Sequence, residues 1–151
     1  EVKHATCSSD KARKILNYKT TISLDESIDK VINVILTDFK IILGCDIVNL
    51  FSTYNESDIN SLHAIDKKIA KSYFEDNEIT NLNQNPEGIL LYFPNKSKFI
   101  KSYILLRISI DEKIFIIAMG SKNIKKFSQN QQVSLVEYLI KIIEIKLKEL
   151  I

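Results

Sequence analysis

The C-terminal segment constrains the fold most, because it contains more apolar surface than one contact can cover. One apolar line has the 3-4-3-4-3 spacing of a helical seam and comprises Val133, Val136, Ile140, Ile143, Leu147 and Leu150. A second line beside it comprises Leu135, Leu139 and Ile142. We expect a helix from about Gln131 to the C-terminus whose first line packs on a sheet. The second line is either buried deep in the monomer or packed on a partner helix, and the pattern favours neither.

A second long helix is expected near the N-terminal end of the domain. Ser23 and Glu26 have the spacing of a capping box, which satisfies free amides at a helix start. The apolar residues that follow recur at spacings of four and three, and these are Ile28, Ile32, Ile35, Phe39 and Ile42. Gly44 comes just after them, where a glycine often ends a helix. Residues 1–21 are expected to form a helical lead-in.

Two neighbouring strands are expected to form a hairpin at the core of a sheet. Tyr103–Ile110 alternates, with an apolar face of Ile104, Leu106, Ile108 and Ile110 and a mixed face of Tyr103, Leu105, Arg107 and Ser109. Asp111–Lys113 is short enough to turn the chain directly into Ile114–Met119. Because Ile114–Met119 is apolar on both faces, we expect it at the centre of the sheet.

Two shorter apolar runs, Cys45–Thr53 and Ile89–Phe93, complete the expected sheet. Between them, residues 57–74 are expected to be mainly helical and residues 75–88 to be an asparagine-rich loop. The order is then helix, strand, helical insert, three strands and helix. It predicts a single α+β domain over residues 22–151, with an antiparallel sheet and long N- and C-terminal helices packed on one face. This order matches the GAF/PAS group of sensor domains.

Length and charge limit the function classes. The chain has 151 residues and a formal net charge of +2, so one domain is expected and the whole chain is not a polycation. Nearly all basic residues are lysines, and Arg13 and Arg107 are the only arginines. No run of about 18 apolar residues is free of charges, so no membrane association through a transmembrane helix is expected. Cys7 and Cys45 lack metal or disulfide spacing, which favours free thiols and a cytoplasmic protein.

Three stretches of the sequence together resemble one known family. "IFIIAMGSKNIKKF", followed by a long amphipathic helix, resembles a Leu-Gly-Ser and Arg-Phe segment, with Met119 and Lys126 as the departures. "SLDESIDKVINVILTDFKIILGCDIVNLF" resembles an opening helix and first strand, and "GILLYFPNKSKFIKSYILLRI" resembles middle strands. The family is a GAF-like bacterial family, domain of unknown function family 484 (DUF484). The resemblance covers about residues 22–151 and implies a GAF-like fold, with no cofactor and no agreed catalytic residues.

Two nucleotide-binding motifs are incomplete. A P-loop needs two glycines and a lysine directly before a helix, whereas Gly120 stands alone and the next helix is expected about ten residues later. We expect Gly120 to allow a tight exit from the strand, the lysines after it to form a solvated rim, and Phe127 to cover the core. "NKSKF" at Asn95–Phe99 imitates the start of a cyclic-nucleotide signature of some GAF domains but lacks its Asp-Glu pair.

The sequence contains no recognisable catalytic or metal-binding constellation. Cys45 is expected to be a small buried residue, because no base or cation that would lower its pKa can be assigned. His4 and His63 lie far apart and have no ligand spacing to Cys, Asp or Glu. We therefore expect that the protein is not an enzyme.

Arg107 is the most informative candidate for ligand binding. It lies within a strand on the mixed face, and a guanidinium can hold a carboxylate or phosphate by two parallel bonds. In GAF-like domains the sheet face opposite the long helices holds the ligand pocket, which would contain Tyr103, Arg107 and Ser109. The competing interpretation is an exposed arginine, or one paired with Glu75 or Asp76.

Lysines cluster at Asn95–Lys101 and Lys122–Lys126, with Phe99 and Tyr103 among them, a combination that can bind single-stranded nucleic acid. The small net charge and the general use of lysine argue against nucleic acid and for a solvated rim. The expected function is a non-catalytic sensory module that binds an unidentified small ligand. The alternative is a ligand-free scaffold that docks a protein partner. In both cases we expect a homodimer through the long helices.

Overall fold

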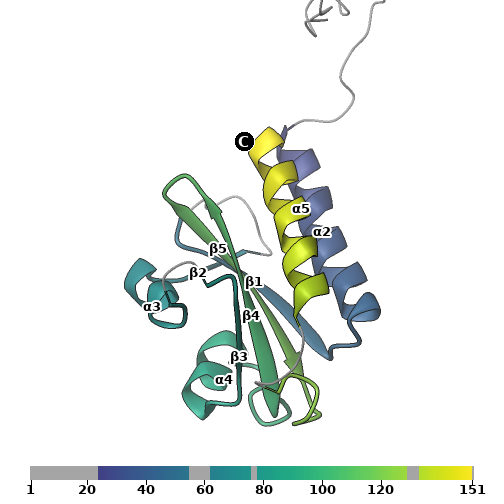
Figure 1. The fold of residues 1–151 in the computed structure, drawn as a ribbon, viewed down its shortest axis with the longest axis vertical. Coiled ribbons are helices and arrows are strands. Elements are labelled where there is room, and N and C mark those ends of the chain that lie inside the picture. Colours follow the sequence, from purple (N-terminus) through teal and green to yellow (C-terminus); the bar gives the residue numbers. More distant parts are fainter. Residues whose placement is uncertain (1–23, 55–61, 76–77, 129–132, 151) are drawn as a thin grey trace, which may run out of the picture.

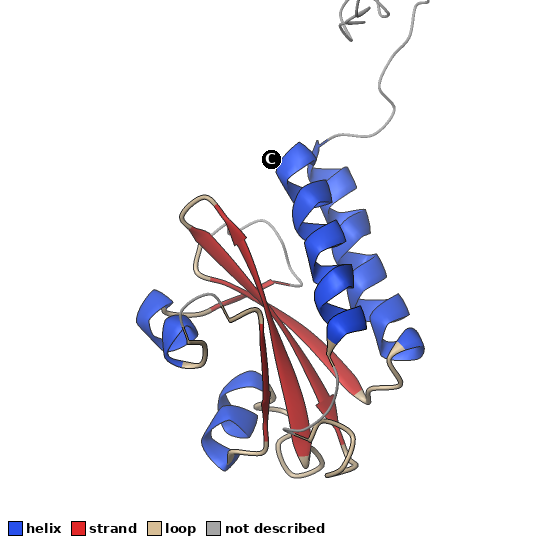
Figure 2. Cartoon of the chain, viewed as in Figure 1, coloured by secondary structure: helices blue, strands red, loops and turns tan. Residues whose placement is uncertain are grey.

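The protein is described by a computed structural model that covers residues 24–54, 62–75, 78–128 and 133–150. A five-stranded sheet forms its centre, and helices cover both faces (Figures 1 and 2). The strands are β1 (Ile47–Ser52), β2 (Leu62–Ala64), β3 (Thr80–Asn83), β4 (Ser102–Ile110) and β5 (Lys113–Ser121). The helices are α2 (Leu24–Ile42), α3 (Lys67–Ser72), α4 (Pro86–Tyr92) and α5 (Ser134–Leu150). The described residues therefore form a mixed domain of the expected α+β class.

The strand order across the sheet is β2-β1-β5-β4-β3, with β5 in the middle as predicted. β5 pairs antiparallel with both neighbours, so that Ile117 lies opposite Leu106 of β4 and Leu50 of β1. The hairpin between β4 and β5 is also confirmed, with Ile110 opposite Lys113. The expectation of a wholly antiparallel sheet is wrong, because β2 pairs parallel with β1. A three-residue edge strand has too short a pattern to specify its direction.

The two long helices cover one face of the sheet and run antiparallel to each other (Figure 1). The predicted apolar face of β4 packs beneath them, and its contacts on the helices include Ile35, Phe39, Ile140 and Leu147. α2 is followed by Gly44 at φ 60°, the left-handed conformation that a glycine adopts without strain. α2 and α5 therefore share one face of the sheet.

The short helices α3 and α4 cover the opposite face. Their apolar side chains, together with Phe51 of β1 and the loop residue Ile100, enclose the other side of the hairpin. The buried residues of this second core are Phe51, Ala70, Phe74, Ile89, Tyr92, Phe93, Ile100, Tyr103, Leu105, Ile114, Ile116 and Ala118. The sheet is thus buried on both faces, as the two apolar sides of β5 require.

The segment between β1 and β4 differs from the prediction in three places. Ile89–Phe93, expected as a strand, belongs to α4 and its C-terminal cap, because Asn85 caps the helix and Pro86 occupies its first turn. The strand that pairs with the outer side of β4 is instead β3, which lies within the segment expected to be a loop. The expected helix over residues 57–74 is reduced to α3, preceded by β2.

Gly120 has a different role from the predicted one. It lies within β5, opposite Ile47 of β1 and Tyr103 of β4, rather than at the exit from the strand. A Cβ atom at this position would lie 3.0 Å from both Ile100 Cδ1 and Ile47 Cγ2. The glycine therefore makes room for close packing. Phe127 is buried, as expected of a residue that covers the core.

Some expectations fall outside the described residues. These are the lead-in over residues 1–21, the capping role of Ser23, the pairing of Arg107 with Asp76, and the surroundings of His4, Cys7 and Arg13. In the described part of the chain, no helix has the length and apolar character needed to cross a membrane.

Candidate functional site

The sheet face opposite the long helices is closed around Tyr103. Its side chain is fully buried and contacts the rings of Tyr92 and Phe93, with centroid distances of 6.4 and 6.0 Å. Gly88 of α4 lies directly above the Tyr103 phenol, and a Cβ atom there would come within 2.7 Å of the ring carbon Cζ. Tyr103 therefore fills the place in which the sequence predicts a ligand pocket.

Two hydroxyl groups beneath α4 are buried without a partner among the described residues. They belong to Tyr92 and Tyr103. Burial raises the pKa of both phenols, and the neighbouring Tyr73 raises them further. Both hydroxyls consequently stay protonated at neutral pH.

A groove of about 450 Å³ opens beyond the closed region, where the mixed face of β4 reaches the hairpin. It is lined by Lys67, Lys71, Phe74, Arg107, Ser109, Asp111, Glu112 and Ile114. The structure therefore brings Arg107 and Ser109 of the predicted site together and separates them from Tyr103. The groove combines three cationic side chains with two carboxylates and one aromatic ring.

Arg107 is held in the groove by its backbone and by one ring. Its amide donates to the Ile79 carbonyl at 2.8 Å, just beyond the ladder of β3 and β4. The guanidinium carbon lies 5.3 Å from the centroid of Phe74, within the range of a cation–π interaction. No described carboxylate, Glu75 included, lies within ion-pair distance of this guanidinium. The donors of Arg107 therefore point into a groove with no ionic partner from the described chain.

The lysines of the groove come from α3 and were not recognised as binding candidates from the sequence. Asp66 caps α3 by accepting from the amides of Lys68 and Ile69 at 2.8 and 3.2 Å. This cap starts the helix at Lys67, so Lys67 and Lys71 lie one turn apart and both line the groove. The spacing of Asp66, Lys67 and Lys71 is a readable signal for a short capped helix, but the packing of this helix on β5 is a tertiary feature.

The hairpin between β4 and β5 supplies the two carboxylates of this groove. Asp111 occupies the first loop position with φ 53°, a left-handed conformation that aspartate tolerates better than most residues. Asp111 and Glu112 are exposed and lie across the groove from the lysines of α3. A small molecule with an anionic group and an apolar part fits this chemistry, with Arg107 for the anion and Phe74 for the apolar part.

Cys45 has the surroundings of a structural thiol. It is 5% exposed, and its Sγ donates weakly to the Phe39 carbonyl at 3.9 Å. Burial raises the pKa of the thiol, outweighing the nearby ammonium groups of Lys40 and Lys126, which lower it. A thiol nucleophile needs the opposite shift.

His63 lies at the sheet edge on β2. It is exposed, and its ring centroid lies 5.3 Å from that of Phe51. Within the described residues, no group of three or more His, Cys, Asp or Glu side chains is placed to hold a metal ion.

The loop after β5 does not present free amides for a phosphate. The Lys122 amide donates to the Asp46 carboxylate at 2.7 Å, and the Ser121 hydroxyl donates to the same oxygen at 3.3 Å. The Asn123 amide donates in turn to the Ser121 hydroxyl at 3.1 Å. The Asp46 carboxylate thus engages the Lys122 amide, which is therefore not free to bind a phosphate.

Comparison with known proteins identifies no match for this chain, either among protein-family models or among curated proteins. The resemblance to DUF484 thus gains no support from sequence comparison.

Proposed function

We propose that this chain is a non-catalytic interaction module that pairs with a second copy of itself through the outer face of α2 and α5. The observation that carries the proposal is an exposed apolar seam on α5. It has a spacing of three, four and three residues, and it comprises Leu135, Tyr138, Ile142 and Ile145. These side chains are 64%, 62%, 39% and 57% exposed.

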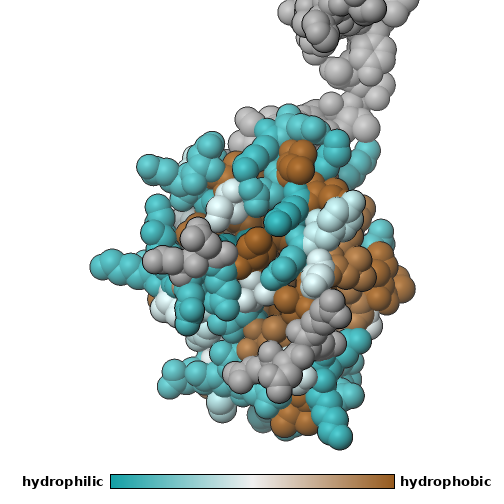
Figure 3. Space-filling model, viewed as in Figure 1, coloured by the Kyte–Doolittle hydropathy of each residue, from teal (hydrophilic) through white to brown (hydrophobic). Residues whose placement is uncertain are grey.

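The exposed seam lies on the side of α5 opposite its buried seam. Ile140 and Leu147 pack on the sheet, so the exposed seam lies away from the domain core, whereas Leu139 of the second apolar line packs against that core. α2 adds Val34, Ile41 and Ile42, which are 51%, 79% and 66% exposed. Figure 3 shows apolar surface on the α2 side of this helical layer. Apolar patches of several hundred Å² on a folded domain commonly mark a site of interaction.

A second copy fits this face by shape and charge. Two antiparallel helices form a flat layer, and a two-fold axis can place the same layer of another molecule against it. Asp38 is exposed between Val34 and Ile41 on α2, whereas Lys141 is exposed beside Ile142 on α5. A pairing of α2 with α5 of the partner places these opposite charges near each other. A different protein with a complementary helical face is the competing occupant.

Light scattering coupled to size-exclusion chromatography tests the proposal. We expect a dimer at micromolar concentration and a monomer for Tyr138→Lys, which places a charge on the seam without touching the core. Leu90→Lys is the matched control, because Leu90 is 61% exposed on α4 and outside this face. A wild-type monomer at all concentrations up to about 100 μM, or a dimer that survives Tyr138→Lys, would contradict the pairing.

The fold supports a GAF-like interpretation at the level of architecture. Long helices from both ends of the domain share one sheet face, and shorter helices cover the other. The parallel pair of β1 and β2 departs from the expected arrangement. The closed surroundings of Tyr103 favour a scaffold over a sensor with a pocket in the centre of that face.

Ligand sensing is a second candidate, and the groove at Arg107 favours it. A half-buried guanidinium that stacks on Phe74, beside Lys67 and Lys71, is suited to a small carboxylate or phosphate. A thermal-shift screen of such anions tests this candidate. A stabilising anion should lose its effect with Arg107→Ala and keep it with Lys125→Ala, a cation that does not line this groove. An identified anion whose shift is unchanged by Arg107→Ala would remove Arg107 from the role.

A further inference from the structure

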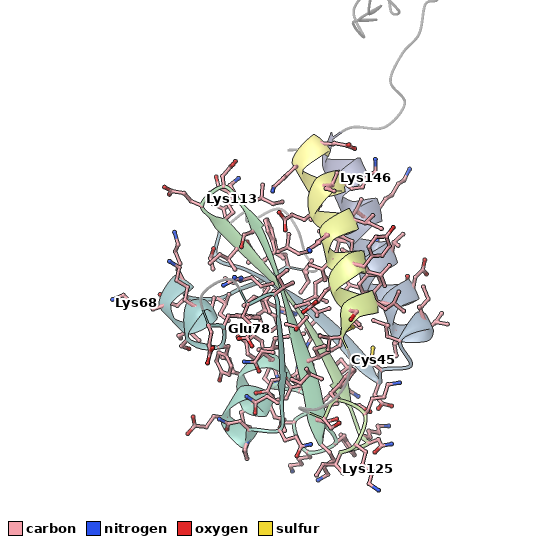
Figure 4. All side chains as sticks on the ribbon, viewed as in Figure 1. Cys45, Lys68, Glu78, Lys113, Lys125 and Lys146 are labelled. Atoms are coloured by element: carbon pink, nitrogen blue, oxygen red, sulfur yellow. The ribbon has the colours of Figure 1, made fainter. Side chains whose placement is uncertain are left out.

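The fold gathers seven lysines at the end of the molecule where α2 finishes and β4 begins. They come from three segments that are distant in sequence, and they are Lys40, Lys96, Lys98, Lys101, Lys122, Lys125 and Lys126. Figure 4 shows Lys125 at this end and Lys146 at the opposite end. We call this surface the lysine end. Over residues 40–47, 94–101 and 122–128 the only carboxylate is Asp46.

The three segments are fixed against one another by hydrogen bonds. Lys101 donates its amide to the Ser121 carbonyl at 2.8 Å, and the Ser102 hydroxyl donates to the Asn123 carbonyl at 2.6 Å. The Asp46 carboxylate accepts from the Lys122 amide at 2.7 Å. Asp46 is therefore engaged with the backbone, and no described carboxylate forms an ion pair with the seven ammonium groups.

The net charge of the chain conceals this asymmetry. The formal charge of +2 includes the seven lysines of this end, so the remainder of the sequence is net acidic. A local cationic surface attracts polyanions irrespective of a small total charge, because screening confines the interaction to about 10 Å. The lysine clusters that the sequence shows separately thus act as one surface.

Two adjoining grooves run along β1 at the lysine end. The first, of about 320 Å³, is lined by Lys40, Asp46, Ile47, Lys96, Phe99, Ile100 and Lys122. The second, of about 250 Å³, shares Ile47 and Lys96 with it and continues past Asn49, Phe51, His63, Phe93, Pro94 and Asn95. Lysines therefore line a concave path rather than the rim of a projecting apolar tip.

An aromatic ring stands beside this path. Phe99 is 56% exposed, and the Lys122 ammonium lies 6.0 Å from its ring centroid. The exposed His63 ring lies along the second groove. Exposed rings next to lysines allow unpaired bases to stack while the lysines contact phosphates. Tyr103 and Phe127, which also lie near these lysines in sequence, are buried and cannot contribute.

We propose that the lysine end binds single-stranded nucleic acid along the two grooves, with Lys40, Lys96 and Lys122 at phosphates and Phe99 stacked on a base. Concavity and exposed aromatic rings favour a strand over an anionic membrane surface, because unpaired bases can stack on the rings while the lysines contact phosphates. The proposal does not rest on dimerisation, because Lys96, Phe99 and Lys122 lie outside α2 and α5.

Fluorescence anisotropy with a fluorescein-labelled 20-nucleotide oligothymidine tests the proposal across a potassium chloride series. We expect binding at 50 mM salt that weakens steeply as salt rises, by a slope of about −0.7 for each phosphate contact. Lys96→Gln/Lys122→Gln removes two of these contacts and should reduce the magnitude of the slope by about 1.4. Lys67→Gln/Lys71→Gln makes the same change in net charge at the other groove and should leave the slope unchanged.

Two further arms identify the ligand class. Phe99→Ala should weaken binding of the oligonucleotide about tenfold, whereas Leu90→Ala should not. A duplex of the same length should bind more weakly, since its bases are not free to stack. The proposal is overturned by absence of oligonucleotide binding at 50 mM salt, by equal losses in the two lysine variants, or by equal binding of duplex with no effect of Phe99→Ala. Binding to phosphatidylserine vesicles without binding to the oligonucleotide would assign the surface to membranes instead.

Discussion

Gly88 of α4 lies so close to Tyr103 of β4 that a methyl group at position 88 would overlap the phenol. This contact seals α4 onto the sheet and fills the space in which a central pocket was expected. The closure depends on one missing side chain, because φ at Gly88 lies outside the left-handed region and the backbone itself would accept another residue.

Gly88→Ala should destabilise the fold by about 1–3 kcal/mol, the usual range for overpacking a core. Urea unfolding followed by circular dichroism measures the change. Tyr103→Phe removes the hydroxyl nearest to the added methyl group, so the double variant should recover part of the loss. If the changes in the free energy of unfolding simply add in the double variant, the strain lies elsewhere in α4.

Tyr103→Phe by itself should leave the free energy of unfolding unchanged at pH 7 or raise it by about 1 kcal/mol. The hydroxyl is buried with no partner among the described residues, and an unsatisfied buried hydroxyl opposes folding. A loss of more than about 1 kcal/mol would show that the hydroxyl has a stabilising partner, such as an ordered water.

Alkaline pH should destabilise the protein through the same two phenols. Their pKa values are raised in the folded state, so the unfolded chain releases these protons first, near the ordinary value of about 10. Stability from these groups is complete below that pH and declines as pH rises from there toward the higher folded pKa. Urea titrations at pH 8 and 10.5 should show a smaller decline for Tyr103→Phe than for the wild type.

Cys45 should react slowly with iodoacetamide in the folded protein. Its thiol is buried and its pKa is raised, so little thiolate is present at neutral pH. The measurement uses a Cys7→Ser background, in which mass spectrometry reports Cys45 alone. We expect labelling at pH 7.5 at least about tenfold slower than in the urea-unfolded protein. Fast labelling of the folded form would instead indicate that the Cys45 thiol is reactive.

The two seams of α5 should separate stability from association. Ile140 is fully buried on the sheet, and Ile140→Ala should lower the free energy of unfolding by about 2–5 kcal/mol. Leu135 is 64% exposed, and Leu135→Ala should change the stability of the monomer by less than about 0.5 kcal/mol while weakening the dimer. Unfolding at concentrations below dimerisation distinguishes the two effects.

Strong periodicity made the long elements predictable from sequence. The alternation of β4 assigned each residue to the correct face, and the spacing of Ile32, Ile35 and Phe39 identified the buried side of α2. The errors fall where patterns are short. Ile89–Phe93 is an apolar run compatible with either structure, and the decisive signals were the cap at Asn85 and the proline after it.

The candidate sites were predictable only in part, since they depend on packing between distant segments. Arg107 and Ser109 follow from the register of β4, but the lysines that join them come from the position of α3. β3 has little strand character of its own and forms by pairing with β4, as Leu82 does opposite Ile104. The clustering of lysines from α2 and two later loops likewise exists only in the folded chain.

The antiparallel arrangement of α2 and α5 places the beginning of α2 and the end of α5 at one end of the molecule, remote from Lys125 (Figures 1 and 4). The start of α2 and the end of α5 therefore both lie on the side of the described domain away from the lysine end. A protein tethered beyond either helix would present its lysines outward. Immobilisation through a terminal tag consequently orients the molecule with its proposed polyanion surface open to solution.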